Sequence, residues 1–236
     1  MTLFHWFGKK KLRLGMAGTH PAEAALAAST GVLIVTAAIA AGSGLAAQNR
    51  QQQGEAARIE RGRYLATIGG CNDCHTPLKL NEEGKAPEQD WSRRLSGHPG
   101  GAPDPATELK PGDLAVMGPT STSFRMPFGV VYAANLTPDK ATGLGEWTKE
   151  MFVSALRKGT HMGGEGRVIL PPMPWVQIGQ LSDSDLEAVF AYLRSLPAIR
   201  NEVPEPKVPP DVMDAISVAT KQRYLVEKHL APEAKR

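Results

Sequence analysis

Two cysteines and a histidine at fixed spacing constrain this chain most. Residues 71–75 read Cys-Asn-Asp-Cys-His, and Cys71 and Cys74 are the only cysteines in the 236-residue sequence. The C-x-x-C-H pattern is the attachment motif for a c-type haem. Its two thiols add across the two vinyl groups of one porphyrin edge, and the imidazole that follows is thereby held at the iron as an axial ligand. We therefore predict one covalently attached haem c, bound by Cys71 and Cys74, with its iron bound by His75.

Two other chemistries use a C-x-x-C pair. The common structural zinc sites need further cysteines, and this sequence has none to supply. A redox dithiol accompanies a βαβ pattern, which the neighbouring sequence does not show. A second haem would need a second C-x-x-C-H. Attachment of one haem is therefore the interpretation that we follow.

The N-terminal region is basic and then apolar. Residues 1–23 carry four lysines and arginines and one glutamate, which accounts for the net charge of +3, and the remaining chain has 23 basic and 23 acidic residues. Because the body is not a polycation, its composition does not indicate nucleic acid as a partner. Residues 24–47 contain no charged residue, and about 20 apolar residues suffice for a helix to span a bilayer.

This apolar stretch predicts export of everything that follows it. The positive-inside rule places residues 1–23 in the cytoplasm. The alternative is a signal peptide cleaved near Gly44-Leu45-Ala46, but the stretch is longer than the roughly 7–15 residues usual for such a segment. We therefore favour an uncleaved anchor and expect the protein on the periplasmic side of the bacterial cytoplasmic membrane. Cleavage would leave it soluble in the periplasm.

Apolar residues at helical spacing predict a helix before the motif. Ile59, Gly62, Leu65 and Ile68 fall at threefold spacing within 55–68, and two glycines end this segment just before the motif. Gly62 within the stripe weakens a helix, so a close approach by another helix is the reason that we expect for it.

Three more helices are predicted after the motif. Thr148 is expected to cap a short helix that ends at Gly159, and Ser182 to cap a second one that Pro197 stops. A last helix is expected over 211–230. Residues 76–127 are rich in Pro and Gly and predict long loops over the haem edge, with disorder as the alternative for 81–112, while 128–132 reads as extended.

The predicted architecture is mostly α: a cytochrome c fold, with helices packed around one covalent haem, long Pro/Gly-rich loops and an N-terminal transmembrane helix. We divide the chain into a basic arm (1–23), an anchor or signal peptide (24–47), a haem domain (48–203), and a Pro-rich tail and helix (204–236) that leave the domain.

The second axial ligand decides the chemistry of such a haem. Met173 stands between Pro172 and Pro174, each of which fixes φ near about −65°, so its thioether lies on a stiff loop. That loop precedes the helix over 182–197, and preorganisation of this kind suits a weak metal–thioether bond. Met173 is therefore the predicted second ligand. Met126, His161 and His98 remain as alternatives.

Taken together, the motif, the Met loop and the flanking helices resemble class I cytochrome c. Over about residues 58–200 the chain looks like one haem domain of the cytochrome subunits of membrane-bound alcohol and aldehyde dehydrogenases. The matching segments are Pro127-Phe128-Gly129, Ala134 to Asp139, Thr142 to Gly145, Trp147-Thr148, Pro172 to Trp175 and Leu186 to Pro197. Those relatives usually carry three haem domains, whereas this chain has one motif. Its Leu95-to-Pro99 element looks like a related group of single-haem exported cytochromes.

The resemblance implies His75/Met173 ligation, and it implies that polar loop residues shield or hydrogen-bond the haem propionates. The positions expected to do so are Asn135, Thr137, Trp175, Arg125 and Tyr132. For Asn135 and Thr137 the alternative is that they only shape a turn.

The implied function is electron transfer rather than catalysis. The protein would accept electrons from a dehydrogenase or quinol-oxidising complex and pass them to another cytochrome or a terminal oxidase. It would do so as a mobile carrier or as the cytochrome subunit of an oxidoreductase complex. The alternative is a haem enzyme or sensor, such as a peroxidase or small-molecule oxidoreductase, with an open or labile sixth site. No evident acid–base pair in the sequence supports that alternative.

Overall fold

A computed structural model describes residues 48–164 and 166–230. The chain divides into a unit of residues 1–53 and a second unit of residues 54–236. In the first unit residues 48–53 are helical, and in the second unit residues 54–68 are helical. Within the described ranges, no helix has the length and apolarity needed to cross a membrane. The predicted basic arm and anchor, residues 1–23 and 24–47, lie outside these ranges.

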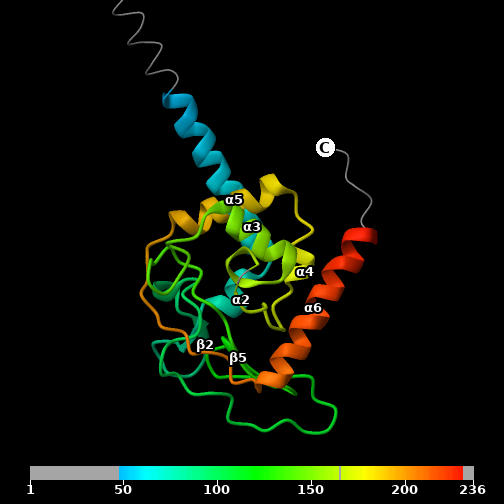
Figure 1. Ribbon diagram of the computed structural model, residues 1–236. Coiled ribbons are helices and arrows are strands. Elements are labelled where there is room, and N and C mark those ends of the chain that lie inside the picture. The colour runs from blue at the N-terminus through cyan, green and yellow to red at the C-terminus, as the bar shows by residue number, and fades with distance from the viewer. Residues whose placement is uncertain (1–47, 165, 231–236) are drawn as a thin grey trace, which may run out of the picture. The chain divides into compact units, whose positions relative to one another are not determined.

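Helices on either side of the motif form the main core of the second unit. The helix over 54–68 packs with α3 (Lys149–Lys158) and α5 (Asp183–Ser195), and all three can be followed in Figure 1. The ion pair between Arg61 Nε and Asp185 Oδ1, at 2.9 Å, also links the helix over 54–68 to α5. The buried side chains of this core include Leu65, Ala66, Phe152, Leu156, Leu186, Val189, Phe190 and Leu193.

The boundaries of α3 and α5 confirm the predicted capping signals. Thr148 Oγ1 accepts the Met151 N–H at 3.2 Å, and Gly159 ends α3 with a left-handed φ of 69°. Ser182 Oγ accepts the Asp185 N–H at 3.1 Å, and α5 ends two residues before Pro197. Each side-chain oxygen satisfies a backbone donor that the first helical turn leaves free. The short elements η2 (His161–Gly163) and α4 (Trp175–Ile178) lie between these helices.

Gly62 marks the closest approach of two helices, as predicted. A Cβ at this position would lie 1.9 Å from the Ala188 carbonyl oxygen and 2.8 Å from Tyr192 Cβ, so α5 runs against the glycine backbone. The prediction that Ile68 shares this buried face was wrong, because Ile68 is 64% exposed. Each residue turns a helix by about 100°, so a threefold spacing drifts by about 60° per step and carries Ile68 to the opposite side from Ile59.

Small antiparallel sheets occupy part of the region predicted as loops. One joins β1 (Leu78–Leu80) to β2 (Pro87–Gln89), and η1 (Trp91–Arg93) follows. The other has the order β3 (Val116–Met117), β4 (Ser123–Met126), β5 (Gly129–Tyr132). The fold therefore combines the predicted helices with some antiparallel sheet, which the mostly α prediction did not include. Strands of two to four residues are too short to show an alternating pattern, whereas the extended segment expected at 128–132 is confirmed as β5.

Residues 207–216 pack against the sheet and its apolar cluster, although the segment from residue 204 onward was predicted to leave the domain. Lys207 pairs with Val130 of β5 through two backbone hydrogen bonds, of 2.8 and 3.1 Å. The helix α6 (Pro210–Leu230) then places Met213 and Ile216 on a second apolar cluster. The buried members of that cluster are Phe124, Val131, Val168 and Leu170.

Candidate functional site

The C-x-x-C-H motif folds as a single helical segment, α2 (Cys71–His75). It is preceded by Gly70, whose φ of 68° is left-handed and suits a residue without a side chain. The Gly69 N–H donates to Leu65 O at 2.8 Å and ends the preceding helix, so the chain turns at the two glycines and starts again. Residues three apart on a helix share a face. The turn therefore presents Cys71 and Cys74 on the same side.

His75 is held in the tautomer that a metal ligand needs. The side chain is buried, and Nδ1 lies 2.8 Å from the Ala134 carbonyl oxygen. A carbonyl can only accept, so Nδ1 carries the proton and the lone pair of Nε2 is left to bind a metal. Burial lowers the pKa of His75, although the bond to Ala134 opposes this shift. The imidazole is therefore neutral at physiological pH.

Cys71 and Cys74 do not form a disulfide with each other. Burial raises the pKa of Cys71 to about 11, and burial likewise raises the pKa of Cys74. Before a haem is attached, both side chains are thus uncharged thiols at neutral pH, and neither brings a buried negative charge to its surroundings.

The motif lines a cavity of about 650 Å³. This volume falls within the range of roughly 300–1,000 Å³ typical of cofactor pockets. Cys71, Cys74, His75 and Met173 all contribute to its wall. The apolar part of the wall is formed by Phe124, Val131, Leu136, Leu144, Phe152, Leu156, Val189 and Leu193, among others. An apolar cavity with two thiols, an oriented imidazole and a thioether fits a haem c in size, polarity and donor set.

Two of the predicted candidates for the second axial ligand lie in this wall. Among the candidates whose side chains the structure describes, they are Met173 and His161. His98 is completely buried elsewhere, with Nδ1 2.9 Å from Thr122 Oγ1, and Met126 packs in the second apolar cluster. Burial and, to a lesser extent, the nearby Arg167 lower the pKa of His161 to about 4, so this imidazole is also neutral.

Two of the five predicted polar positions lie in the cavity wall. Tyr132 does so, and its hydroxyl donates to Asp104 Oδ1 at 2.6 Å. Asn135 does so as well, but its amide is fully engaged within the chain. Its Nδ2 donates to Thr142 Oγ1 and to Ile199 O, and its Oδ1 accepts from the backbone and the hydroxyl of Thr137. The alternative role of shaping the turn is therefore visible in the structure.

The structure places the other three predicted residues outside the wall. Thr137 is fully buried, and its hydroxyl donates to Asn135 and accepts from the Ile199 N–H. Arg125 donates to the Pro105 carbonyl at 2.8 Å. Trp175 packs in the main core, where a Cβ on Gly159 would lie 2.5 Å from its ring. Their side chains instead stabilise the loops and the core. The spacing of residues in a motif does not show which of these roles a polar side chain takes.

Sequence reasoning missed Arg167 and the segment 202–206, which also line the cavity. The Arg167 side chain is only 33% exposed, and burial lowers its pKa. Among the described residues, it forms an ion pair with Glu205, whose Oε2 lies 3.7 Å from Nε on a side chain that is 88% exposed. Arg167 is the only lysine or arginine between α3 and Met173. This lone positive charge before Met173 was the one feature of the sequence that could have indicated a role at the cavity, and it is a weak one.

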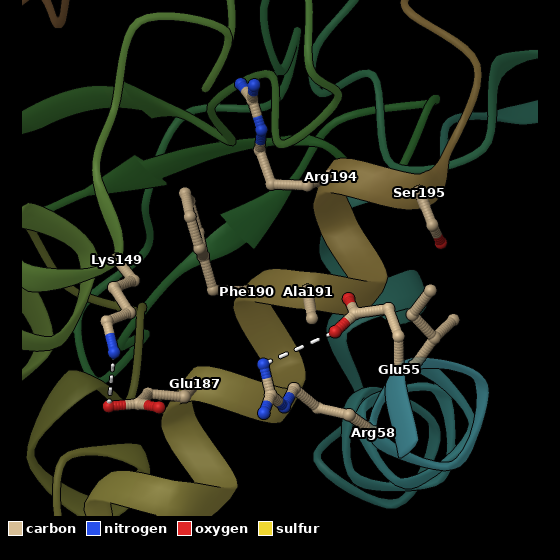
Figure 2. A pocket seen from close by; sticks show the side chains of 9 residues that line it. Glu55, Arg58, Lys149, Glu187, Phe190, Ala191, Arg194 and Ser195 are labelled. Atoms are coloured by element: carbon tan, nitrogen blue, oxygen red, sulfur yellow. Dashed lines mark hydrogen bonds and ion pairs between the residues drawn. The ribbon is translucent and has the colours of Figure 1, made fainter. Parts of the chain in front are cut away.

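A second pocket, a surface groove, lies between the helix over 54–68 and α5. It measures about 470 Å³, and Figure 2 shows its charged rim. Glu55 pairs with Arg58 at 3.3 Å, and Lys149 with Glu187 at 3.2 Å. Arg194 donates to the Leu144 carbonyl at 2.9 Å. Each carboxylate of this groove is thus paired with a lysine or arginine of the chain, and Arg194 binds backbone, so these side chains serve contacts within the fold rather than a binding site.

The cavity with its motif defines the residue set of a c-type cytochrome. No family model matches the chain. Known relatives include one subunit of the nicotinate dehydrogenase of Pseudomonas putida, which is 32% identical over 63% of this chain. The cytochrome c subunit of the quinone-linked alcohol dehydrogenase of Gluconobacter oxydans is 29% identical over 65% of this chain. A dihaem c-type cytochrome of Cereibacter sphaeroides is 28% identical over 78%.

These relatives confirm the resemblance to cytochrome c subunits of membrane-bound dehydrogenases. The chain spans 9% of the nicotinate dehydrogenase subunit, 25% of the alcohol dehydrogenase subunit and 52% of the dihaem cytochrome. It is therefore similar to one part of each longer protein. The last two are named as cytochromes, so the chain is similar to cytochromes, as the sequence resemblance predicts.

Proposed function

We propose that this chain is a single-haem electron carrier of the cytochrome c fold. In this proposal Cys71 and Cys74 hold the haem, and His75 and Met173 bind its iron. One observation carries the proposal: these four side chains line the same apolar cavity of about 650 Å³. The similarity to cytochrome c subunits supports electron transfer as the function.

A bound haem supplies one-electron chemistry, because its iron changes between the ferric and ferrous states. The chain controls this chemistry through position and polarity. The hydrogen bond from His75 Nδ1 to the Ala134 carbonyl orients the imidazole and increases its basicity. The apolar wall excludes water, and a thioether ligand from Met173 raises the reduction potential.

The N-terminal sequence supports a proposal for the cellular location, and the names of the relatives support one for the electron donor. We place the haem domain on the periplasmic side of the cytoplasmic membrane, anchored through residues 24–47. Soluble periplasmic protein after signal cleavage is the alternative. The proposed donor is a dehydrogenase or a quinol-oxidising complex, since relatives are named as subunits of dehydrogenases. The acceptor is another cytochrome or a terminal oxidase.

The test is spectroscopy on the full chain exported in a host that attaches haem c. We expect the mass of one haem per chain, a far-red sulfur-to-iron band in the ferric protein, and slow or absent binding of carbon monoxide by the ferrous protein. Two haems per chain would contradict the single-haem assignment. Rapid carbon monoxide binding without the far-red band would replace the electron carrier by the enzyme or sensor alternative.

Arg167→Gln is expected to lower the reduction potential by tens of millivolts. Arg167 brings a partly buried positive charge to the cavity wall, where a haem propionate is its natural partner. A unit charge within about 8–16 Å contributes on the order of 1–2 kcal/mol at an effective dielectric constant of about 20. Loss of this charge favours the ferric state. Redox titration at low and high salt measures the shift.

Arg157→Gln is the matched control for this measurement. Its side chain is also 33% exposed and forms an ion pair, here with Asp183 at 2.7 Å, but it does not contribute to the cavity wall. The potential of the control should stay near that of the parent protein. Equal shifts in the two variants would show that Arg167 acts only through the net charge or the stability of the chain.

A further inference from the structure

Residues 201–207, here called the strap, cross the wall of the cavity. The central residues 202–206 contribute directly to the wall. Asn201 anchors the first end and is almost fully buried. Its Nδ2 donates to the carbonyls of Ser96 and His98 at 2.7 and 2.8 Å, and its Oδ1 accepts from Gly100 N–H and Arg93 at 3.0 Å each. This end is therefore fixed by four hydrogen bonds of the Asn201 side chain and by a fifth from its backbone N–H to Thr142 Oγ1.

Lys207 anchors the other end. Its backbone pairs with Val130 of β5, and its Nζ lies 2.6 Å from Asp104 Oδ2. The second oxygen of Asp104 accepts from the Tyr132 hydroxyl at 2.6 Å. The hydrogen bond from Lys207 is the main cause that lowers the pKa of Asp104, so both partners are charged at neutral pH.

The strap has little support between these ends. Residues 202–206 make no backbone–backbone hydrogen bond with any described residue. Pro204 and Pro206 stiffen the segment but remove two backbone donors. The ion pair between Arg167 and Glu205, at 3.7 Å with an exposed carboxylate, is weak. The position of this part of the wall therefore depends on the anchors at the two ends.

We propose that Asp104 and Lys207 are positioning residues that keep the strap seated as a wall of the haem cavity and so limit the access of water and small reductants. The inference rests on the proposed function. Tyr132 strengthens the argument, because it belongs to the cavity wall and shares the Asp104 carboxylate. One carboxylate thus ties together the strap, β5 and the loop at residue 104.

The experiment compares Lys207→Met and Asp104→Ala with Lys85→Met in the full-length haem protein. Lys85 is a suitable control, because it also forms an exposed ion pair, with Glu83 at 3.5 Å, and does not line the cavity. A neutral hydroquinone should reduce the two strap variants about fivefold faster than the parent, since loss of an ion pair increases local opening. The far-red band should remain, and Lys207→Arg should restore the parent rate.

Hydrogen exchange within 201–207 is measured in parallel and does not depend on haem. It should become faster in Lys207→Met and Asp104→Ala, and stay unchanged in Lys85→Met. Reduction rates and exchange equal to those of the control would overturn the inference. A parent protein without haem or without the far-red band would instead contradict the proposed function, while the exchange experiment would still decide whether the two residues seat the strap.

Discussion

Met173→Ala should abolish the far-red band of the ferric protein and lower its reduction potential by on the order of 0.2 V, within the range of about 0.8 V over which axial ligands move haem potentials. The reason is that a soft thioether favours ferrous iron, and its loss leaves the ferric state relatively more stable. Met173 lines the same cavity as His75. Absorption spectra and a redox titration of the exported protein provide the measurement.

Met126→Ala is the control, because Met126 was the next methionine candidate but packs in the second apolar cluster. It should keep both the band and the potential. A band that survives in Met173→Ala would move the ligand assignment away from Met173. The double variant Met173→Ala, His161→Phe then tests whether His161 is the ligand instead. If His161 binds the iron once Met173 is gone, the single variant stays low-spin and the double variant becomes high-spin.

The parts of the site that are local in sequence were predictable. The haem motif depends on residues within five positions, and α3 and α5 begin and end at their own capping residues. Gly62 was also informative, because a glycine on an apolar helix face has few explanations other than a close neighbour. For the motif and the caps, the physical cause lies within one or two helical turns of the residue that signals it, whereas Gly62 signals a close neighbour without identifying α5 as that neighbour.

Contacts between distant segments were not predictable. Pro204 and Pro206 were interpreted as the start of a tail that leaves the domain, yet the pairing of Lys207 with Val130 returns this segment to the cavity wall. Thr137 was expected near a propionate, but its hydroxyl instead binds the backbone of Ile199, 62 residues further along the chain. A polar residue in a loop gives no sign of which distant backbone group it satisfies.

Gly62→Ala should destabilise the protein by roughly 2–3 kcal/mol, since overpacking of a well-packed contact costs about 1–3 kcal/mol and occasionally more. The added Cβ would lie 1.9 Å from the Ala188 carbonyl oxygen, which is backbone of α5 and cannot rotate away. The two helices must separate, and α5 also contributes Val189 and Leu193 to the cavity. We therefore expect weaker haem incorporation as well as a lower midpoint of urea unfolding.

Gly54→Ala provides the matched control on the same helix, because a Cβ at Gly54 has no atom within 4 Å. Alanine is the better helix former by about 1 kcal/mol, so this variant should be as stable as the parent or slightly more stable. Alanine brings the same gain in helix propensity at position 62, so the destabilisation expected for Gly62→Ala is the net effect after that gain. If the two variants unfold at the same urea concentration, α5 can shift to accept the extra methyl group, and the helix crossing does not fix the cavity.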